Sequence, residues 1–307
     1  MRGQDGAYPR REEGSGRVTR SRASGVCAVV VLFEPDASVV ENVNSCMREV
    51  DRVFAVDNST HPGAVSAAIA ATGAEVIGLG ENEGMGAALN LGCRRAAEEG
   101  FAWALTLDQD STPMPGMAPA LALCLSGESG ADVAIVAPLL QHEGGATERT
   151  EATCVDVPFA VTSGSLLRIA AFEALGGFRE DLFIDQVDNE FCLRARRNGW
   201  RIVQRRDAVL VHRMGRLERA RFPFTFYVTN YSPLRWYYRL RNLLEVKREY
   251  GREFPDWAHA EWLQWRKELL KALLAEPGRW RKLRMLVRGW RDYRRGRFGR
   301  YEELHSS

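Results

Sequence analysis

The strongest constraint on the fold is an alternation of short apolar runs with helix-like stretches in the first half of the chain. The runs are VCAVVVLF, RVFAVD, AEVIGL, FAWALTLD and ADVAIVAP, all between residues 26 and 138. Each run is apolar on both faces, as expected of a strand buried in a parallel sheet that helices cover on both sides. The sequence therefore predicts an α/β fold with a doubly wound sheet, whose ligands bind at the carboxyl ends of the strands.

Polar and aromatic side chains gather where this rule predicts a ligand. Phe33 ends the first run, Asp57 ends the second, Asn82 follows the third, and Asp108 and Asp110 end the fourth. Two carboxylates one residue apart repel each other, and a bound cation offsets that repulsion. We expect this pair to hold Mg²⁺ or Mn²⁺ together with a nucleotide diphosphate.

Several of these positions also have an ordinary structural explanation. Phe33 either stacks on a nucleobase or belongs to the core, and Asp57 either binds the nucleotide or caps a turn. Gly84 and Gly86, in ENEGMGAALNLG, either let a phosphate approach the start of the next helix or form a tight strand-to-helix connection.

A second acidic group lies in LFIDQVDNEFCLRARRNGW, residues 182–200. Asp185, Asp188 and Glu190 either stabilise a helix N-terminus through its dipole, or one of them is a partly desolvated general base. His212, after the strand-like DAVLV, is either structural or a neutral third metal ligand beside Asp110.

Seven segments, in this order, resemble family 2 glycosyltransferases of the GT-A fold, and most closely bacterial rhamnosyltransferases. They lie between residues 26 and 215 and are VVVLFEPD, VFAVDNST, LGENEGMGAALNLG, LTLDQDSTP, TSGSLLR, GGFREDLFIDQVDNEFCLR with NGW, and LVHRMG. The resemblance implies an inverting single displacement that moves a sugar, with dTDP-L-rhamnose as the expected donor. The implied acceptor is a hydroxyl of a bacterial cell-surface glycan or a lipid-linked acceptor.

The motifs and the resemblance together give a role to each candidate residue. The nucleotide is expected at Phe33, Asp57, Asn82, Gly84 and Asp108. The metal is expected at Asp110 and His212, with Asp108 as a further candidate. The resemblance makes Asp188 the catalytic base, with Asp185 as the alternative, and its acceptor side falls at Ser163, Gly164 and Glu190. One departure is Leu32-Phe33-Glu34, where the family has a turn similar to Thr-Tyr-Asn.

We expect three regions along the chain. Residues 1–24 form a disordered leader, residues 25–220 form the GT-A domain, and residues 221–307 form a basic helical region. Within the domain, a nucleotide half (25–137) precedes an acceptor half (138–220).

The helical region ends in a basic amphipathic helix, Arg279–Arg300. It either docks on the anionic headgroups of a membrane or packs on the catalytic domain or another subunit, as in a homo-oligomer.

Composition excludes some classes of protein and leaves others open. A net charge of +2 and the lack of a nucleic-acid-reading motif argue against nucleic-acid binding. The six cysteines are scattered singly, which predicts reduced, packed thiols in a cytoplasmic protein, peripheral at most on the inner face of the membrane. A transferase with a UDP donor, galactofuranosyl or another hexosyl, and a non-catalytic nucleotide-sugar binder remain alternatives.

Overall fold

The computed structural model describes residues 23–61, 63–125, 130–142, 153–212, 218–221 and 225–302, without the side chains of residues 64, 142, 212, 218–221 and 225–227. Residues 1–22 of the predicted leader lie outside this description. Residues 23 and 24, the last two of the predicted leader, belong to the sheet, since strand β1 begins at Ala23.

The described strands form one large sheet and a separate hairpin. The order in the large sheet is β3 (Glu75–Gly78), β2 (Val50–Asp57), β1 (Ala23–Leu32), β4 (Trp103–Asp108), β8 (Ser165–Arg168), β6 (Val133–His142), β9 (Arg201–His212) and β5 (Ser111–Pro113), with β7 (Cys154–Asp156) also paired to β9. Strands β3, β2, β1, β4, β6 and β9 run in one direction, and β8, β5 and β7 run in the other. The predicted α/β fold with a mostly parallel sheet is confirmed.

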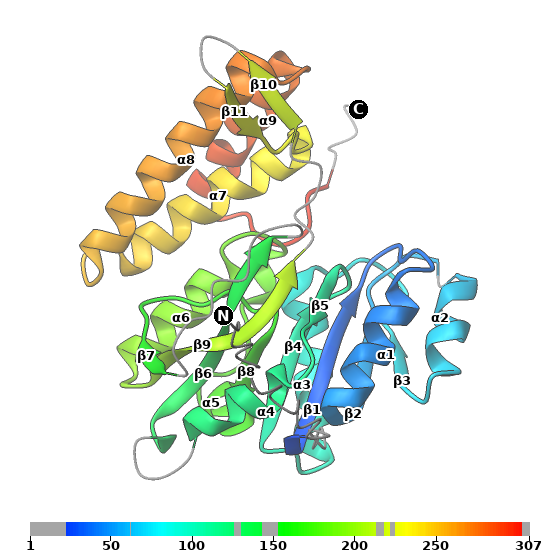
Figure 1. Ribbon diagram of the computed structural model, residues 1–307. Helices are drawn as coiled ribbons and strands as arrows, with labels where there is room; N and C mark the ends of the chain where they lie inside the picture. The colour runs from blue at the N-terminus through cyan, green and yellow to red at the C-terminus, as the bar shows by residue number, and fades with distance from the viewer. Residues whose placement is uncertain are drawn as a thin grey trace, which may run out of the picture.

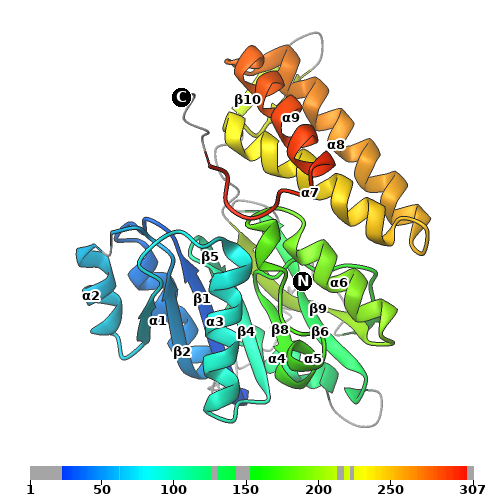
Figure 2. The same cartoon turned by 180° about the vertical axis from the view of Figure 1, so that it is seen from behind.

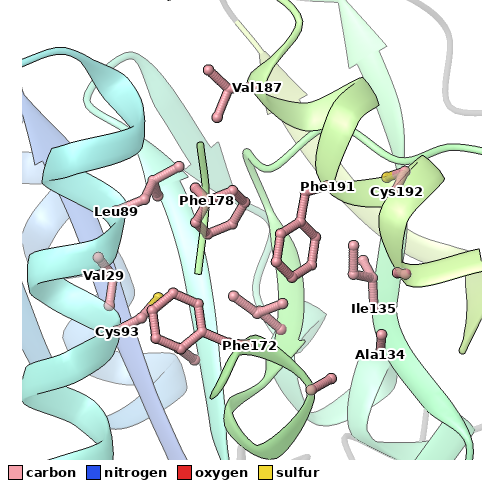
Figure 3. Packing of buried hydrophobic residues seen from close by; sticks show 14 of the residues in the cluster. Val29, Leu89, Cys93, Ala134, Ile135, Phe172, Phe178, Val187, Phe191 and Cys192 are labelled. Atoms are coloured by element: carbon pink, nitrogen blue, oxygen red, sulfur yellow. The ribbon is translucent and has the colours of Figure 1, made fainter. Parts of the chain in front are cut away.

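Helices cover both faces of this sheet. One face carries α1 (Val39–Glu49), α2 (Ala64–Ala70), α4 (Met117–Ala122) and η1 (Leu123–Leu125), and the other carries α3 (Met85–Glu98), α5 (Ile169–Ala174), η3 (Glu180–Leu182) and α6 (Val187–Arg197). Alternate residues of β1 enter the two cores, Val29 on the α3 side and Val30 on the α1 side. On the α3 side, the rings of Phe178 and Phe191 pack 4.5 Å apart between α3 and α6 (Figure 3).

The last third of the chain forms a helical unit, which we define as α7 (Pro233–Tyr250), α8 (Pro255–Ala275) and α9 (Arg279–Arg294). A hairpin of β10 (Glu218–Arg221) and β11 (Thr225–Val228) precedes it. Figures 1 and 2 show the helical unit beyond the edge at which β1 and β9 end. The chain after α9 then runs back between the helices and the sheet, where Gly299 N donates to Asp181 O at 2.6 Å.

Helix α9 packs closely on α7. A Cβ at Gly289 would lie 2.6 Å from the carbonyl oxygen of Tyr237, so only glycine allows this approach. The buried Asp292 accepts a hydrogen bond of 3.0 Å from the Tyr237 hydroxyl. The inner face of the predicted basic helix is therefore a packing surface within the same chain.

The prediction of six reduced cysteines is wrong for one pair. Cys124 and Cys154 form a disulfide, because η1 and β7 bring their Cα atoms to 5.8 Å, a proximity that a separation of 30 residues does not reveal. The other four are buried free thiols, and burial raises the pKa of Cys46, Cys93 and Cys192 to about 12. Among the described helices, none has the length and apolar composition needed to cross a bilayer.

Candidate active site

A cavity of about 770 Å³ lies between the carboxyl edge of the sheet and the helical unit. Its sheet side carries four acids, namely Asp108, Asp110, Asp185 and Asp188. Its other wall comes from the helical unit and the residues just before it, and includes Tyr231, Arg235, Arg239, Glu261 and Trp265. The structure thus brings both predicted acidic groups to one site, although about 75 residues separate them in the sequence.

Asp108 is held at the end of β4 by the segment before β8. Its backbone N–H donates to Ser163 Oγ at 3.0 Å, and Ser163 Oγ in turn bonds Ser111 Oγ at 2.8 Å. Burial, followed by the charges of Asp188 and Asp110, raises the pKa of Asp108 to about 7. The site therefore concentrates negative charge that a cation would stabilise.

Asp188 lies in the first turn of α6 and faces the same cavity. Thr162 Oγ1 donates to its Oδ1 at 3.0 Å. Burial raises the pKa of Asp188, while the Thr162 hydrogen bonds act in the opposite direction. A carboxylate with a raised pKa accepts a proton more readily, which suits a general base.

Asp185 has a different environment because Arg235 of α7 pairs with it. The Arg235 Nε to Asp185 Oδ2 distance is 2.6 Å, and Arg235 Nη2 donates to Oδ1 at 3.0 Å. The guanidinium of Arg235 thus occupies both carboxylate oxygens of Asp185. The geometry therefore favours Asp188 over Asp185 for proton transfer.

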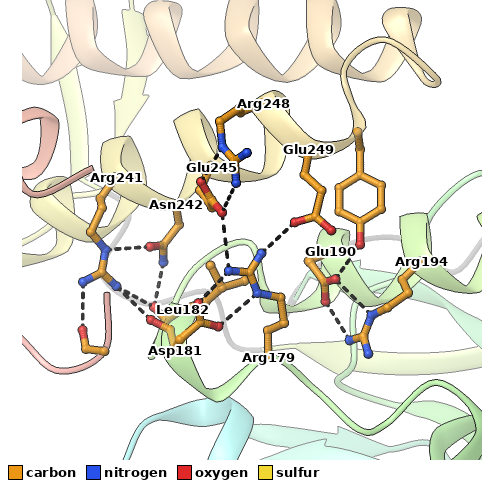
Figure 4. A network of polar contacts seen from close by, with 12 residues as sticks. Arg179, Asp181, Leu182, Glu190, Arg194, Arg241, Asn242, Glu245, Arg248 and Glu249 are labelled. Atoms are coloured by element: carbon orange, nitrogen blue, oxygen red, sulfur yellow. Dashed lines mark hydrogen bonds and ion pairs between the residues drawn. The ribbon is translucent and has the colours of Figure 1, made fainter. Parts of the chain in front are cut away.

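The loop before α6 has an unusual backbone. Phe183, Asp185 and Gln186 all have positive φ, at 64°, 68° and 65°, a region that non-glycine residues rarely adopt. Helix α7 holds this conformation, since Asn242 Nδ2 donates to Leu182 O at 2.7 Å (Figure 4). The same nitrogen donates to Ile184 O at 2.7 Å. The helical unit thus fixes the loop that carries Asp185 and leads into α6, where Asp188 lies.

Arginine side chains tie the same loop to α7 at two further points. Arg241 Nη2 donates to Leu182 O at 3.1 Å, and Arg179 Nη1 pairs with Glu249 at 3.0 Å (Figure 4). Arg241 is fully buried, so its hydrogen bonds to backbone carbonyls are the contacts that offset its desolvation.

Of the predicted nucleotide residues, Asp108 lines this cavity, whereas Phe33, Asp57, Asn82 and Gly84 are not part of its lining. The Phe33 side chain is 47% exposed, which fits a stacking surface and not a core position. Gln109, between the two acids, bonds both Phe33 N (2.8 Å) and Phe33 O (3.0 Å). Asp57 is buried and accepts from Ser59 N and Ser66 Oγ, so its carboxylate caps a turn here.

Asn82 and Gly84 form the connection into α3. Asn82 Oδ1 accepts from Gly84 N at 3.1 Å and from Asn58 Nδ2 at 3.2 Å. Gly84 has φ of 91°, and a Cβ there would lie 2.5 Å from Phe183 O, to which Met85 N donates at 2.7 Å. The close neighbour of this glycine is the backbone of the loop before α6, and the predicted approach of a phosphate stays a prediction.

The residues predicted on the acceptor side lie behind the cavity surface. Ser163 and Gly164 are buried beneath the end of β4. Glu190 is 1% exposed and accepts hydrogen bonds from Arg194 and from the Tyr250 hydroxyl, at 3.0 and 2.7 Å. The structure does not bring Ser163, Gly164 or Glu190 to the cavity lining.

The remaining predicted metal ligand, His212, has its side chain outside the described part of the structure. Its backbone pairs with Ser111 in the β5–β9 ladder, one residue from Asp110. Among the described residues, no three His, Cys, Asp or Glu side chains form a cluster able to hold a metal alone. The carboxylate oxygens of Asp108 and Asp110 fit Mg²⁺ or Mn²⁺ as a partial set that substrate oxygens complete.

Sequence reasoning missed the residues that surround these acids. Gln109, within the acidic motif itself, was readable as a polar residue at a strand end. Arg235 and Trp265 carry no local signal, because only the tertiary fold brings them to the cavity. Thr162 begins TSGSLLR, one of the segments that resemble the family, but its contact with Asp188 is visible only in the structure.

Comparison with known proteins identifies the family. Residues 27–176 match the model of Glycosyl transferase family 2. The chain is also 28% identical over 244 residues to dTDP-rhamnosyl transferase RfbF of Shigella flexneri, across 74% of this chain and 81% of that protein. The chain belongs to glycosyltransferase family 2. In this glycosyltransferase the segment that matches the family model includes Asp108 and Asp110 and ends before Asp185 and Asp188.

Two solved structures resemble the chain at low sequence identity. The crystal structure of GalNAc-T7 with UDP, GalNAc and Mn²⁺ matches with a TM-score of 0.59 at 15% identity, over 76% of this chain and 49% of that one. That of S. aureus TarS matches with a TM-score of 0.47 at 15% identity, over 86% and 42%. The GalNAc-T7 likeness shows the GT-A fold, and the chain spans about half the length of these two proteins.

The raised pKa of Asp108 predicts how stability depends on pH. Its carboxyl group has a pKa near 7 in the folded protein and about 3.9 when unfolded, so it stabilises the fold fully below pH 4 and loses this contribution as pH rises to 7. Asp108→Asn should remove that decline and raise the free energy of unfolding at pH 8 by on the order of 2–4 kcal/mol.

Urea unfolding at pH 5 and pH 8 measures this difference, with Asp256→Asn on the exposed start of α8 as the control. If the free energy of unfolding depends on pH in the same way for Asp108→Asn and the wild type, the prediction is wrong and Asp108 has an ordinary pKa.

Proposed function

We propose that this glycosyltransferase transfers L-rhamnose from dTDP-L-rhamnose to a hydroxyl of a bacterial cell-surface glycan or lipid-linked acceptor, with inversion at the anomeric carbon. The observation that carries the proposal is the convergence of Asp108, Asp110 and Asp188 on one cavity. The similarity to a protein named as a dTDP-rhamnosyl transferase supports the donor.

In this proposal each residue around the cavity has a separate role in the reaction. Asp188 takes the proton of the acceptor hydroxyl as its oxygen attacks the anomeric carbon, and the bond to the diphosphate breaks. Thr162 orients the Asp188 carboxylate, and Arg235 keeps Asp185 engaged. Asp110 and Asp108 would hold Mg²⁺ or Mn²⁺, which when bound stabilises negative charge on the leaving diphosphate.

The nucleotide lies on the neighbouring side of the sheet edge. The exposed ring of Phe33 offers a face for the base, and Gln109 fixes that residue's backbone next to Asp108 and Asp110. The GT-A domain would then span residues 25–220, and the helical region that follows would close the acceptor side.

A donor panel tests the proposed activity. dTDP-L-rhamnose, UDP-galactofuranose and UDP-hexoses are each incubated with and without Mn²⁺ or Mg²⁺, and release of free nucleoside diphosphate is measured. We expect the highest rate with dTDP-L-rhamnose and a divalent ion. Equal or faster release from a UDP-sugar would contradict the rhamnose donor while leaving the family assignment intact.

Substitution of the base separates chemistry from binding. Asp188→Asn keeps the size and the Thr162 contact but cannot take a proton, so transfer should fall about 10²–10⁴-fold while dTDP affinity stays near that of the wild type. Turnover and dTDP binding are measured on the same preparation, with Asp185→Asn as the matched variant. If Asp185→Asn loses transfer and Asp188→Asn does not, the base is Asp185.

We further propose that the outer face of α9 docks on an anionic membrane surface. Trp280, Val287 and Trp290 are exposed there by 79%, 49% and 50%, and the exposed Arg284 and Arg291 alternate with them. Apolar and cationic groups on one exposed face are the combination that binds a headgroup layer. Such a surface would bring a lipid-linked acceptor to the cavity.

Charge reversal on this face tests the membrane proposal. Arg284→Glu with Arg291→Glu should reduce sedimentation with phosphatidylglycerol vesicles at least tenfold, since each cation near the surface contributes about 1 kcal/mol. The control is Arg48→Glu with Arg252→Glu, which changes the same charge on exposed residues elsewhere. Equal sedimentation of both variants, or binding that salt does not weaken, would contradict docking through α9.

A further inference from the structure

A second cavity, of about 860 Å³, adjoins the first one between α6 and α8. Phe159, Asn189 and Glu261 line both cavities. Asn189 directly follows Asp188, so the second cavity begins one residue from the proposed base.

A chain of hydrogen bonds forms the boundary between the two cavities. Asn189 Nδ2 donates to Gln186 Oε1 at 3.1 Å, and Gln186 Nε2 donates to Glu261 Oε1 at 2.8 Å. Beside the ring of Phe159, this part of the boundary consists of amide and carboxylate side chains, whose contacts a ligand rich in hydroxyls can replace.

The lining of the second cavity has the chemistry that binds a carbohydrate. Phe159, Phe254 and Trp257 supply aromatic surface, on which the apolar C–H face of a sugar ring packs. Asp256 and Gln264 supply polar groups that bond to hydroxyls. A volume of this size lies within the range of about 300–1,000 Å³ that is usual for small-ligand sites.

One tryptophan in the lining of each cavity has a buried indole N–H with no hydrogen-bond partner within the part of the chain that the structure describes. These tryptophans are Trp265 for the first cavity and Trp257 for the second. The two residues are 8% and 7% exposed. Buried indole donors usually find an acceptor, and a sugar hydroxyl oxygen is one.

We propose that the second cavity is an acceptor subsite, which binds the sugar residue next to the one that receives the transferred sugar. The acceptor is then at least a disaccharide, with one residue at Asp188 and the next against Trp257. This inference rests on the proposed function and adds the minimum length of its acceptor.

Binding of matched saccharides tests the subsite. Methyl glycosides of L-rhamnose, D-galactose, D-glucose and N-acetyl-D-glucosamine are titrated by calorimetry in the presence of dTDP. Disaccharides that extend each of these sugars at the reducing end are titrated in the same way. For the sugar that binds best, we expect its disaccharide to bind about tenfold more tightly than the monosaccharide.

Two variants locate the source of that advantage. Trp257→Phe removes only the indole N–H and part of the ring, and Gln264→Ala removes an exposed amide at the cavity wall. Both should reduce the disaccharide advantage to about twofold or less, without changing the affinity for the monosaccharide or for dTDP. Trp280→Phe, on the exposed face of α9, is the matched control and should keep the full advantage.

Three results would overturn the subsite. They are equal binding of monosaccharide and disaccharide, an advantage that survives in both variants, and the absence of binding by every glycoside. Gln264→Ala keeps the test decisive if Trp257→Phe unfolds. Because only dTDP is present, a wrong rhamnose donor would appear in the donor panel and not in this experiment.

Discussion

Repulsion among carboxylates is the interaction on which this site depends. Asp108, Asp110 and Asp188 face one cavity, and burial together with the other two charges raises the pKa of Asp108 to about 7. A fold keeps such a cluster only where a ligand or a cation stabilises it, since the same positions as neutral residues would cost less. The donor diphosphate and a divalent ion are the partners that this charge distribution fits.

Contacts from the helical unit give the clustered acids different environments and hold the loop before α6 in place. Arg235 engages Asp185, in the loop before α6, and so distinguishes it from Asp188 in the first turn of that helix. Asn242 and Arg241 bond the backbone carbonyls of that loop, whose positive φ values would be costly without such support. The region after residue 221 is therefore part of the active-site architecture and not only a surface appendage.

The sheet could be predicted from the sequence because its strands are buried on both faces and their apolar runs are continuous. Strand β8 could not, since four residues leave little periodicity and its antiparallel insertion depends on neighbours far along the chain. Asp108 and Asp188 were predictable as acids at a strand end and a helix start. The Arg235 to Asp185 pair was not, because 50 residues separate its members.

For some residues the structure shows contacts other than those that the local sequence suggested. Glu190 is buried, where it pairs with Arg194 and accepts a hydrogen bond from the Tyr250 hydroxyl. Tyr250 lies 60 residues further along the chain, so nothing in the local sequence indicates this contact. At Gly84, where a phosphate was expected, the close neighbour is the backbone of Phe183, which no local pattern indicates. Spacing alone gave no sign that Cys124 and Cys154 would meet.

Anomalous diffraction from crystals grown with dTDP and Mn²⁺ would test the central claim most directly. Our account predicts a manganese peak bonded to the Asp110 carboxylate and to diphosphate oxygens, with the base of the nucleotide against Phe33. A manganese ion bound away from Asp110, or a diphosphate outside the cavity that Asp188 lines, would contradict it.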